Sequence, residues 1–492
     1  MSSRPAEYDD SHRGGNRDRD AEAGTSYQEL ARSPQDGKRV HRGKDGDGIR
    51  QRFTHWFRQH SGFWHESLQP QRDDTYGSYF ATGSALPANT QVIACPAALV
   101  ITRGTARDAL RAFGVDESAS QELNERQLVA GYVAMHRAVG LEKIREDSGI
   151  ARHLKHEPYI STLPTSDEIL TPLQWNDTEL SILDGLNLGH AVRTRRELWR
   201  REWKETVSLL GDASGVELDW DAYLLANTYI SSRAFPSTLL DPSSSRINPS
   251  HQLPNGDAPP TDVPAHEVTP ASYPVLIPGL DTLNHRRNQA VTWVSVAPSE
   301  SGDSTERTVG LVLRTDVPAN EQVFNNYGPK GNEELILGYG FSIVDNPDDT
   351  LALKLGIPTA TLTPDVKDAL SRFDPKASPL DRTWYIPRSG ILPNDLYEIV
   401  RIVLSAHGPT NVDEDPDLEM DVAGLLLEMV QTKLERLNQI LERNEGIIES
   451  GGVREAVWNM VQDYVAGQLD ILTACNEKLE RRMDDLEEAM GG

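Results

Sequence analysis

Two short polar motifs, about 40 residues apart, constrain the fold of this chain most strongly. The first is Asp281-Thr282-Leu283-Asn284-His285, which follows an apolar run at 275–277. The second is Asn325-Asn326-Tyr327-Gly328-Pro329, which precedes a short helical segment ending near Tyr339-Gly340-Phe341. Apolar runs at 290–296, 308–315 and 322–325 are spaced like consecutive antiparallel strands, so both motifs are predicted to lie at strand ends.

The composition divides the rest of the chain into parts. With 492 residues, the chain is longer than one compact core usually requires. Residues 1–50 are rich in Arg, Asp, Gly and Ser, which predicts a disordered tail. Its basic stretch at 38–44 is interpreted as solvated, with a nuclear-import patch as the alternative. Residues 346–492 show helical periodicity, and the segments 418–444 and 453–489 predict an αα-hairpin.

The middle part, residues 51–345, mixes two kinds of apolar pattern. Helical spacing over about 104–229 predicts a helical insertion between β-rich segments. Residues 236–272 are dense in Pro, Ser, Asn and Asp, which predicts a flexible loop. The remaining short runs predict strands, which we expect at 79–81, 91–94, 99–102, 275–277 and in the three segments named above.

Taken together, the motifs resemble the C-terminal SET motifs of protein methyltransferases of the Rubisco large-subunit methyltransferase group. Ser231-Ser232-Arg233-Ala234-Phe235 is similar to the Ser-Arg-x-Phe segment that ends the inserted helices of this group. Histone-type SET enzymes often carry a cysteine-rich zinc motif instead, whereas this chain has no cysteine near Tyr327. The resemblance implies an α+β fold, with a pseudoknotted β-rich SET domain, an inserted helical subdomain and an all-α C-terminal substrate-binding domain.

The resemblance also implies a site for S-adenosyl-L-methionine and no metal. Asn284 and His285 would lie in the pseudoknot and hold the adenine, and Arg233 would contact the methionine carboxylate through its planar, multi-donor guanidinium. Asp281 and Tyr339 would complete the cofactor site. Tyr327 would line both the cofactor site and the transfer site, because a hydroxyl oxygen can face the partly positive methyl group.

One segment departs from the pattern of the group. The group usually has Gly-x-Gly before a strand, where bare backbone approaches the cofactor. In Gly77-Ser78-Tyr79 the first glycine is present and the second is replaced, although Ser78 is small. We assign Gly77 and Ser78 to the cofactor site, and the departure motivates a non-catalytic alternative.

The resemblance implies a protein-lysine N-methyltransferase that acts on a folded protein. Two alternatives stay open: a protein-histidine methyltransferase of the same group, and a SET-derived scaffold that only binds a protein partner. A channel lined by aromatic rings would favour the neutral amine that methyl transfer requires, because desolvation lowers a lysine pKa.

The charge balance bears on the partner. The net charge of −26 argues against direct nucleic-acid binding and leaves room for a basic protein substrate, ribosomal or nuclear. Two distant cysteines and the absence of a long apolar run predict an intracellular protein of the nucleus or cytoplasm, not bound to a membrane. We expect a monomer.

Overall fold

The computed structural model describes residues 45–73, 77–210, 215–241, 246–247, 272–297, 306–357, 359–373, 379–405 and 415–491. Most of the predicted tail, including the basic stretch at 38–44, lies outside these residues, as does most of the predicted loop at 236–272. Helix α1 (Asp45–Gln59) begins inside the range predicted as a tail. Its apolar side chains Phe53 and Phe57 are buried, which explains why the chain is helical there.

The main sheet of the described chain has five strands in the order β1-β4-β9-β8-β6, and all pairs are antiparallel. Gly310 in β9 is required by close packing, because a Cβ there would lie 2.4 Å from the carbonyl oxygen of Ile93 in β4. The strands are β1 (Phe63–Trp64), β4 (Gln91–Pro96), β6 (Arg246–Ile247), β8 (Val291–Val296) and β9 (Thr308–Leu313).

Two smaller antiparallel sheets flank the segments that carry the motifs. One pairs β2 (Leu68–Asp73) with β3 (Gly77–Thr82). The other pairs β5 (Ala234–Pro236), which directly follows Arg233, with β7 (Pro274–Leu276), which leads to Asp281. The second sheet therefore brings two of the predicted site segments to the same end of the fold.

The strand predicted at 322–325 does not form. The predicted strands at 290–296 and 308–315 pair with each other as β8 and β9, but the third segment makes only single bridges to other partners. Gln322 bridges antiparallel to Ala81, and Asn325 bridges parallel to His285. Asn320 has a φ of 64°, and this turn directs the chain away from β9 and across to β3.

The prediction of a strand at 99–102 is also wrong. The segment forms a 3₁₀ turn (Ala97–Leu99) and a single bridge between Ile101 and Leu276. Thr102 then caps a helix, since its side chain accepts a hydrogen bond from the backbone N–H of Thr105. Capping chemistry therefore outweighs the strand propensity of these apolar residues.

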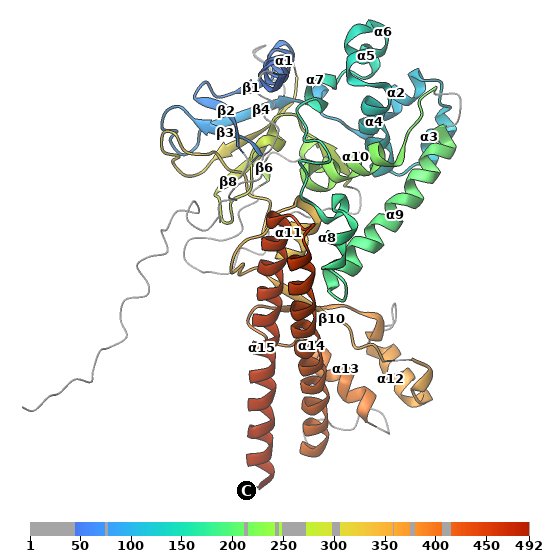
Figure 1. Ribbon diagram of the computed structural model, residues 1–492, viewed down its shortest axis with the longest axis vertical. Coiled ribbons are helices and arrows are strands. Elements are labelled where there is room, and N and C mark those ends of the chain that lie inside the picture. The colour runs from blue at the N-terminus through green and yellow to red at the C-terminus, as the bar shows by residue number, and fades with distance from the viewer. Residues whose placement is uncertain are drawn as a thin grey trace, which may run out of the picture. The chain divides into compact units, whose positions relative to one another are not determined.

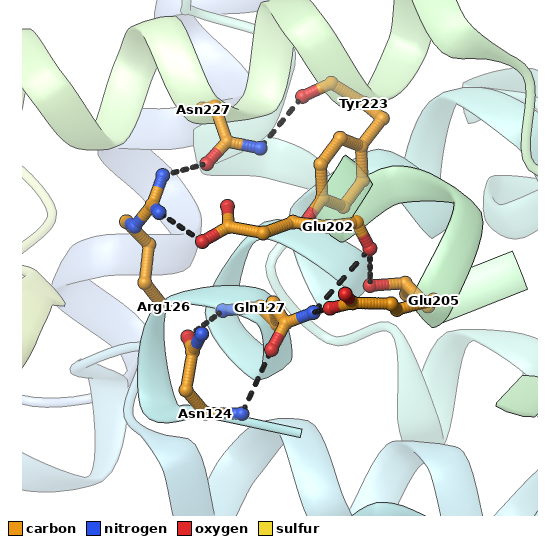
Figure 2. A network of polar contacts seen from close by, with 8 residues as sticks. Asn124, Arg126, Gln127, Glu202, Glu205, Tyr223 and Asn227 are labelled. Carbon is orange, nitrogen blue, oxygen red and sulfur yellow. Dashed lines mark hydrogen bonds and ion pairs between the residues drawn. The ribbon is translucent and has the colours of Figure 1, made fainter. Parts of the chain in front are cut away.

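Helices fill the chain between β4 and β5. In α4 and α10 nearly every central side chain is buried, so these two helices form the centre of the inserted part. A polar network joins α4, α9 and α10 through Arg126, Glu202 and Asn227 (Figure 2). The helices are α2 (Arg103–Ala112), α3 (Glu117–Glu122), α4 (Glu125–Val139), α5 (Leu141–Glu146), α6 (Ser148–His153), α7 (Glu157–Ile160), α8 (Asp177–Ser181), α9 (Asn187–Leu210) and α10 (Trp220–Arg233).

The chain after the second motif is mainly helical, as predicted. The predicted αα-hairpin consists of α14 and α15, which lie side by side (Figure 1). Gly451 and Gly452, both with positive φ, separate the two helices, whereas Gly446 stays within α14. A two-stranded sheet of β10 and β11 was not predicted. The elements are α11 (Asn332–Tyr339), β10 (Thr350–Leu353), α12 (Pro364–Phe373), β11 (Trp384–Pro387), α13 (Asn394–Leu404), α14 (Pro416–Ser450) and α15 (Glu455–Gly491).

Helix α15 packs directly against α11, the short helix that follows the Tyr327 motif. The Tyr464 hydroxyl donates to the Glu333 carboxylate at 3.1 Å. The Asp349 carboxylate accepts the backbone N–H of Asn332 at 2.6 Å, so it caps the start of α11. A Cβ at Gly467 would lie 2.1 Å from the same carboxylate, so only glycine allows α15 this close. Within the described chain, no helix is long and apolar enough to span a bilayer.

Candidate active site

The two sequence motifs pair with each other through their backbones. The N–H of Asn325 donates to the carbonyl oxygen of Asn284 at 2.7 Å, and the N–H of Arg286 donates to the carbonyl oxygen of Asn325 at 3.0 Å. These two bonds form the parallel bridge between His285 and Asn325. Segments about 40 residues apart are therefore fixed beside each other, and the tyrosine that follows is placed against His285.

Asn325 fixes this crossing from the interior. Its side chain is fully buried, and its Oδ1 accepts hydrogen bonds from the Trp293 indole N–H at 2.9 Å and from the N–H of Asn326 at 2.8 Å. The Oδ1 of Asn326 in turn accepts the N–H of Gly328 at 2.9 Å, where φ is +89°. These two asparagines shape the turn around Tyr327. Sequence reasoning did not assign them to the site, although two asparagines before a tyrosine were a visible signal.

Tyr327 is held at three points. Its hydroxyl donates to the carbonyl oxygen of Leu283 at 3.0 Å, and its backbone N–H donates to Nδ1 of His285 at 3.0 Å. The rings of His285 and Tyr327 stack with centroids 5.1 Å apart. Because Nδ1 accepts a hydrogen bond, the neutral imidazole carries its proton on Nε2. Burial lowers the pKa of His285 to about 4, and the nearby charge of Lys330 acts in the same direction.

A row of aromatic rings continues from Tyr327. The Tyr339 ring at the end of α11 stacks on Tyr327 with centroids 5.0 Å apart, and Phe341 lies edge-on to Tyr339 at 6.2 Å. Burial raises the pKa of both tyrosines well above the ordinary value, so both hydroxyls keep their protons. Lys330 lies 5.7 Å from the Tyr339 ring centroid and pairs with Glu334. The structure thus brings three predicted residues, His285, Tyr327 and Tyr339, into one stack.

Arg233 and Asp281 form a second cluster of the site. One guanidinium nitrogen of Arg233, Nη1, donates to the backbone oxygen of Asp281 at 3.0 Å and to its Oδ2 at 3.3 Å. The side chain of Asp281 is 1% exposed and that of Arg233 is 26% exposed. Burial raises the pKa of the Asp281 carboxyl, although the charge of Arg233 acts in the opposite direction. Asp281 therefore serves first as the partner that orients Arg233.

A tyrosine from the helical insertion completes this cluster. The Tyr159 hydroxyl, on α7, donates to Oδ2 of Asp281 at 2.8 Å, and the Tyr159 side chain is buried. Asp281 thus receives one donor from α7 and one from the end of α10. Sequence reasoning missed Tyr159, which follows Pro158 and lies between the predicted helical segments, where no pattern distinguishes it.

Gly77 and Ser78 lie at the start of β3, opposite Asp73 and Arg72 of β2. Gly77 has a φ of +65°, and among the described residues a Cβ built there would meet no atom within 4 Å. Within the described residues, no hydrogen bond, ion pair or ring contact joins Gly77 or Ser78 to the two clusters above. The neighbouring Thr75 and Tyr76 lie outside the described residues.

The donor set of the site suits an anionic, partly aromatic ligand. Arg233 keeps two further nitrogens, Nε and Nη2, for which the described residues supply no partner, and it retains partial exposure. The His285, Tyr327 and Tyr339 rings offer flat apolar surface beside it. Among the described residues, no group of three His, Cys, Asp or Glu side chains is placed to hold a metal ion.

Comparisons with known proteins find sequence relatives of this chain. No family model matches the chain. The ribosomal lysine N-methyltransferase set10 of Schizosaccharomyces pombe is 29% identical over 330 residues, which are 66% of this chain and 51% of that protein. Ribosomal lysine N-methyltransferase 1 of Saccharomyces cerevisiae is 28% identical over 239 residues, or 42% of this chain and 35% of that protein. The chain therefore spans about half the length, or less, of these relatives.

Solved structures are similar over nearly the whole chain. The crystal structure of the SET domain of LSMT bound to lysine and AdoHcy has a TM-score of 0.65 and 18% identity, covering 90% of this chain and 93% of that one. The structure of Rubisco LSMT bound to AdoMet has a TM-score of 0.63, with 18% identity and 89% and 93% coverage. The predicted fold class and the predicted resemblance to the Rubisco large-subunit methyltransferase group are confirmed.

Proposed function

We propose that this protein is an S-adenosylmethionine-dependent protein-lysine N-methyltransferase that acts on a folded protein. The observation that carries the proposal is the backbone pairing of Asn284–Arg286 with Asn325, which holds the Tyr327 hydroxyl against the Leu283 carbonyl. Methyl transfer depends mainly on placement of the reacting atoms, so a hydroxyl fixed in a buried site is the feature it requires.

Tyr327 acts as a neutral hydroxyl in this proposal. Burial raises its pKa far above physiological pH, so it does not serve as a general base. Because its proton is directed to the Leu283 oxygen, the lone pairs of the phenolic oxygen face other groups. Those lone pairs would face the partly positive methyl group and orient the incoming amine, which loses its proton to solvent before attack.

Arg233, Asn284, His285 and Tyr339 would hold the cofactor. When bound, S-adenosylmethionine supplies a methyl group activated by a sulfonium. Arg233, oriented by Asp281, would bind the carboxylate of its methionine part, and Gly77 would offer bare backbone to the ligand. Backbone carbonyl and N–H groups of Asn284 and His285 would accept hydrogen bonds from the adenine and donate hydrogen bonds to it. Asp281 contributes by orienting Arg233, and Ser78 by its small size.

The aromatic row around Tyr327 favours an uncharged amine. His285 is uncharged at physiological pH, and the rings of Tyr327, Tyr339 and Phe341 form an apolar wall. A substrate lysine in this environment would have a lowered pKa, because desolvation disfavours its charged form. The acceptor could instead be histidine, and mass spectrometry of the methylated peptide distinguishes the two amino acids.

The substrate is proposed to be a basic ribosomal protein. Two relatives are named ribosomal lysine N-methyltransferases, and the net charge of −26 favours a basic partner. Such a substrate implies action in the nucleus or cytoplasm.

Calorimetry with S-adenosylmethionine tests the proposal before a substrate is known. Wild type should bind the cofactor, and Asn284→Ala should bind it more weakly, since the altered residue lies at the paired backbone. A thermal shift at millimolar cofactor should accompany binding. No shift and no heat with wild type would instead support a scaffold that binds protein through its helices alone.

A further inference from the structure

Helix α9 carries an unusual concentration of positive charge. Its segment 193–204 holds six Lys or Arg residues, whereas a stretch of that length holds about one on average, since the chain has 49 in 492 residues. The whole chain has 75 acidic residues and a net charge of −26, so this concentration is opposite in sign to the protein as a whole. It therefore does not follow from the overall composition.

Five of these cations lie on one side of α9. Their spacing of three, four, seven and eight residues places them on one helical face. Four are exposed and Arg196 is half-buried. We call this surface the basic face, and it consists of Arg193, Arg196, Arg200, Arg201 and Lys204.

The opposite side of α9 is fixed in the interior. Trp199 and Glu202 are buried, and Glu202 pairs with Arg126 of α4 (Figure 2). Thr206 is buried as well, and its hydroxyl donates to the Glu202 carbonyl at 2.7 Å. These contacts fix the rotation of α9 about its axis. The basic face is therefore held toward the solvent.

Little of this charge is neutralised by the protein itself. Arg193 pairs with the exposed Asp184 at 3.2 Å, and Arg200 lies 4.4 Å from the centroid of the Trp220 ring. Within the described part of the chain, Arg196, Arg201 and Lys204 make no ion pair. Two exposed carboxylates accompany them: Glu197 lies within the face, and Glu205 lies at its edge, where it accepts a hydrogen bond from Gln127. The face remains positive overall.

We propose that the basic face binds the phosphate backbone of RNA, as the second contact with a ribonucleoprotein substrate. The proposal rests on the proposed function in one respect, the ribosomal class of the substrate. A Lys/Arg-rich protein would be repelled by this face, so the face fits the other component of such a particle. Arginine forks also match phosphate oxygens, and four of the five cations are arginines.

The dimensions agree with a backbone contact. Arg193 and Lys204 are eleven residues apart in one helix, which corresponds to roughly 16 Å along its axis. One strand of a nucleic-acid duplex places about five phosphates over that length. The net charge had predicted no nucleic-acid contact, but net charge does not describe a local face of opposite sign.

Fluorescence anisotropy of a labelled RNA hairpin with the full-length protein tests the proposal. Wild type should bind at low salt, and the affinity should fall steeply as salt rises. Neutralising three exposed or half-exposed cations without ion pairs should weaken binding about tenfold or more at low salt and reduce the salt slope by about two to three. This variant is Arg196→Gln/Arg201→Gln/Lys204→Gln.

A matched variant removes three positive charges elsewhere. It changes exposed cations of α12 and α15, and its RNA affinity should stay within about twofold of wild type, since only long-range charge is lost. Equal losses in both variants, or no RNA binding by wild type at low salt, would overturn the proposal. So would equal competition by polyglutamate, which would indicate an acidic peptide instead. The control is Lys367→Gln/Arg372→Gln/Lys478→Gln.

Cofactor calorimetry on the same samples separates this inference from the proposed function. Cofactor binding that persists while RNA binding fails overturns only the role of the basic face. RNA binding by wild type without any cofactor binding supports the face and contradicts the methyltransferase proposal.

Discussion

The Tyr159 hydroxyl donates to Oδ2 of Asp281 at 2.8 Å, and the same carboxylate accepts Nη1 of Arg233. The donor comes from α7, in the helical insertion, and the acceptor comes from the turn that leads to Asn284. The insertion thus supports Arg233 and Asp281, which we propose to be part of the cofactor site. In the proposed site Tyr159 is a positioning residue, because it would act on the ligand only through Asp281 and Arg233.

Tyr159→Phe should therefore weaken cofactor binding more than it slows turnover. Loss of a buried hydrogen bond to a carboxylate costs about 1.5–3 kcal/mol of stability, and a released Asp281 orients Arg233 less well. We expect the cofactor Kd to rise severalfold while kcat stays within about twofold. Tyr132→Phe is the matched control, because it removes a buried hydroxyl that contacts His156 at 2.6 Å rather than Asp281. Equal effects on cofactor Kd in both variants would contradict the role of Tyr159.

Tyr327→Phe should reduce turnover by about 10²–10³ and leave cofactor binding nearly unchanged. The substitution removes only the hydroxyl and keeps the ring between His285 and Tyr339. Methyl incorporation and calorimetry measure the two quantities separately. Tyr339→Phe should reduce turnover much less, because the described contacts of Tyr339 are made by its ring, which the substitution keeps. Full activity of Tyr327→Phe would exclude the hydroxyl from the reaction.

The contribution of His285 to the free energy of unfolding should fall as the pH drops from about 6.5 to 4, whereas the raised pKa of Asp349, about 6, acts with the opposite sign. The pKa of His285 is about 4 in the folded protein and 6.5 ordinarily, so the unfolded chain binds more protons in this window. The stability contribution is present above pH 6.5 and is lost on acidification, when protonated Nδ1 can no longer accept the N–H of Tyr327. His285→Gln should reduce the slope by at most about 1.4 kcal/mol per pH unit. Urea unfolding at several pH values measures it.

His136 provides the comparison for this pH effect. Its pKa is also lowered to about 4 by burial, so it contributes a slope of the same sign. The His285 variant should therefore keep part of the wild-type slope. An unchanged slope in His285→Gln would mean that His285 is not buried in its neutral form.

Gly467→Ala should destabilise the protein by roughly 1–3 kcal/mol, the usual cost of overpacking. Its Cβ would lie 2.1 Å from an Asp349 oxygen, and that carboxylate is held by the backbone N–H and side chain of Asn332. Gly424→Ala in α14 is the control, because a Cβ there meets no atom of the described residues within 4 Å. It should stabilise by about 0.5–1 kcal/mol through helix propensity. Thermal or urea unfolding compares the two variants. If both substitutions change the free energy of unfolding in the same direction, α15 does not pack tightly against Asp349.

Much of the site could be predicted because it lies in short segments with their own chemistry. Asn284-His285 and Asn326-Tyr327 are contiguous polar turns after apolar runs. Their residue types therefore predict that they lie at strand ends. Arg233 was recognisable because Ser232-Arg233-Ala234-Phe235 resembles the Ser-Arg-x-Phe segment of the Rubisco large-subunit methyltransferase group. The pairing of the two motifs was expected from the group of methyltransferases that they resemble.

Other parts depend on contacts that no local pattern records. Tyr159 and Asp281 are 122 residues apart, and their contact depends on how the insertion packs. The segment 322–325 has the composition of a strand, but its bridge partners are Ala81 and His285 rather than β9. Similarly, β10 and β11 are separated by α12, so neither shows a hairpin signal.

The contact of Asp349 with α11 has a consequence for dividing this protein. Composition suggested a division at residue 345, yet the acceptor that begins α11, the helix of Tyr339, lies beyond that point. A fragment ending at 345 would keep every predicted site residue but leave the Asn332 amide without its partner. The aromatic row and the C-terminal helices should therefore gain or lose order together, as one cooperative unit.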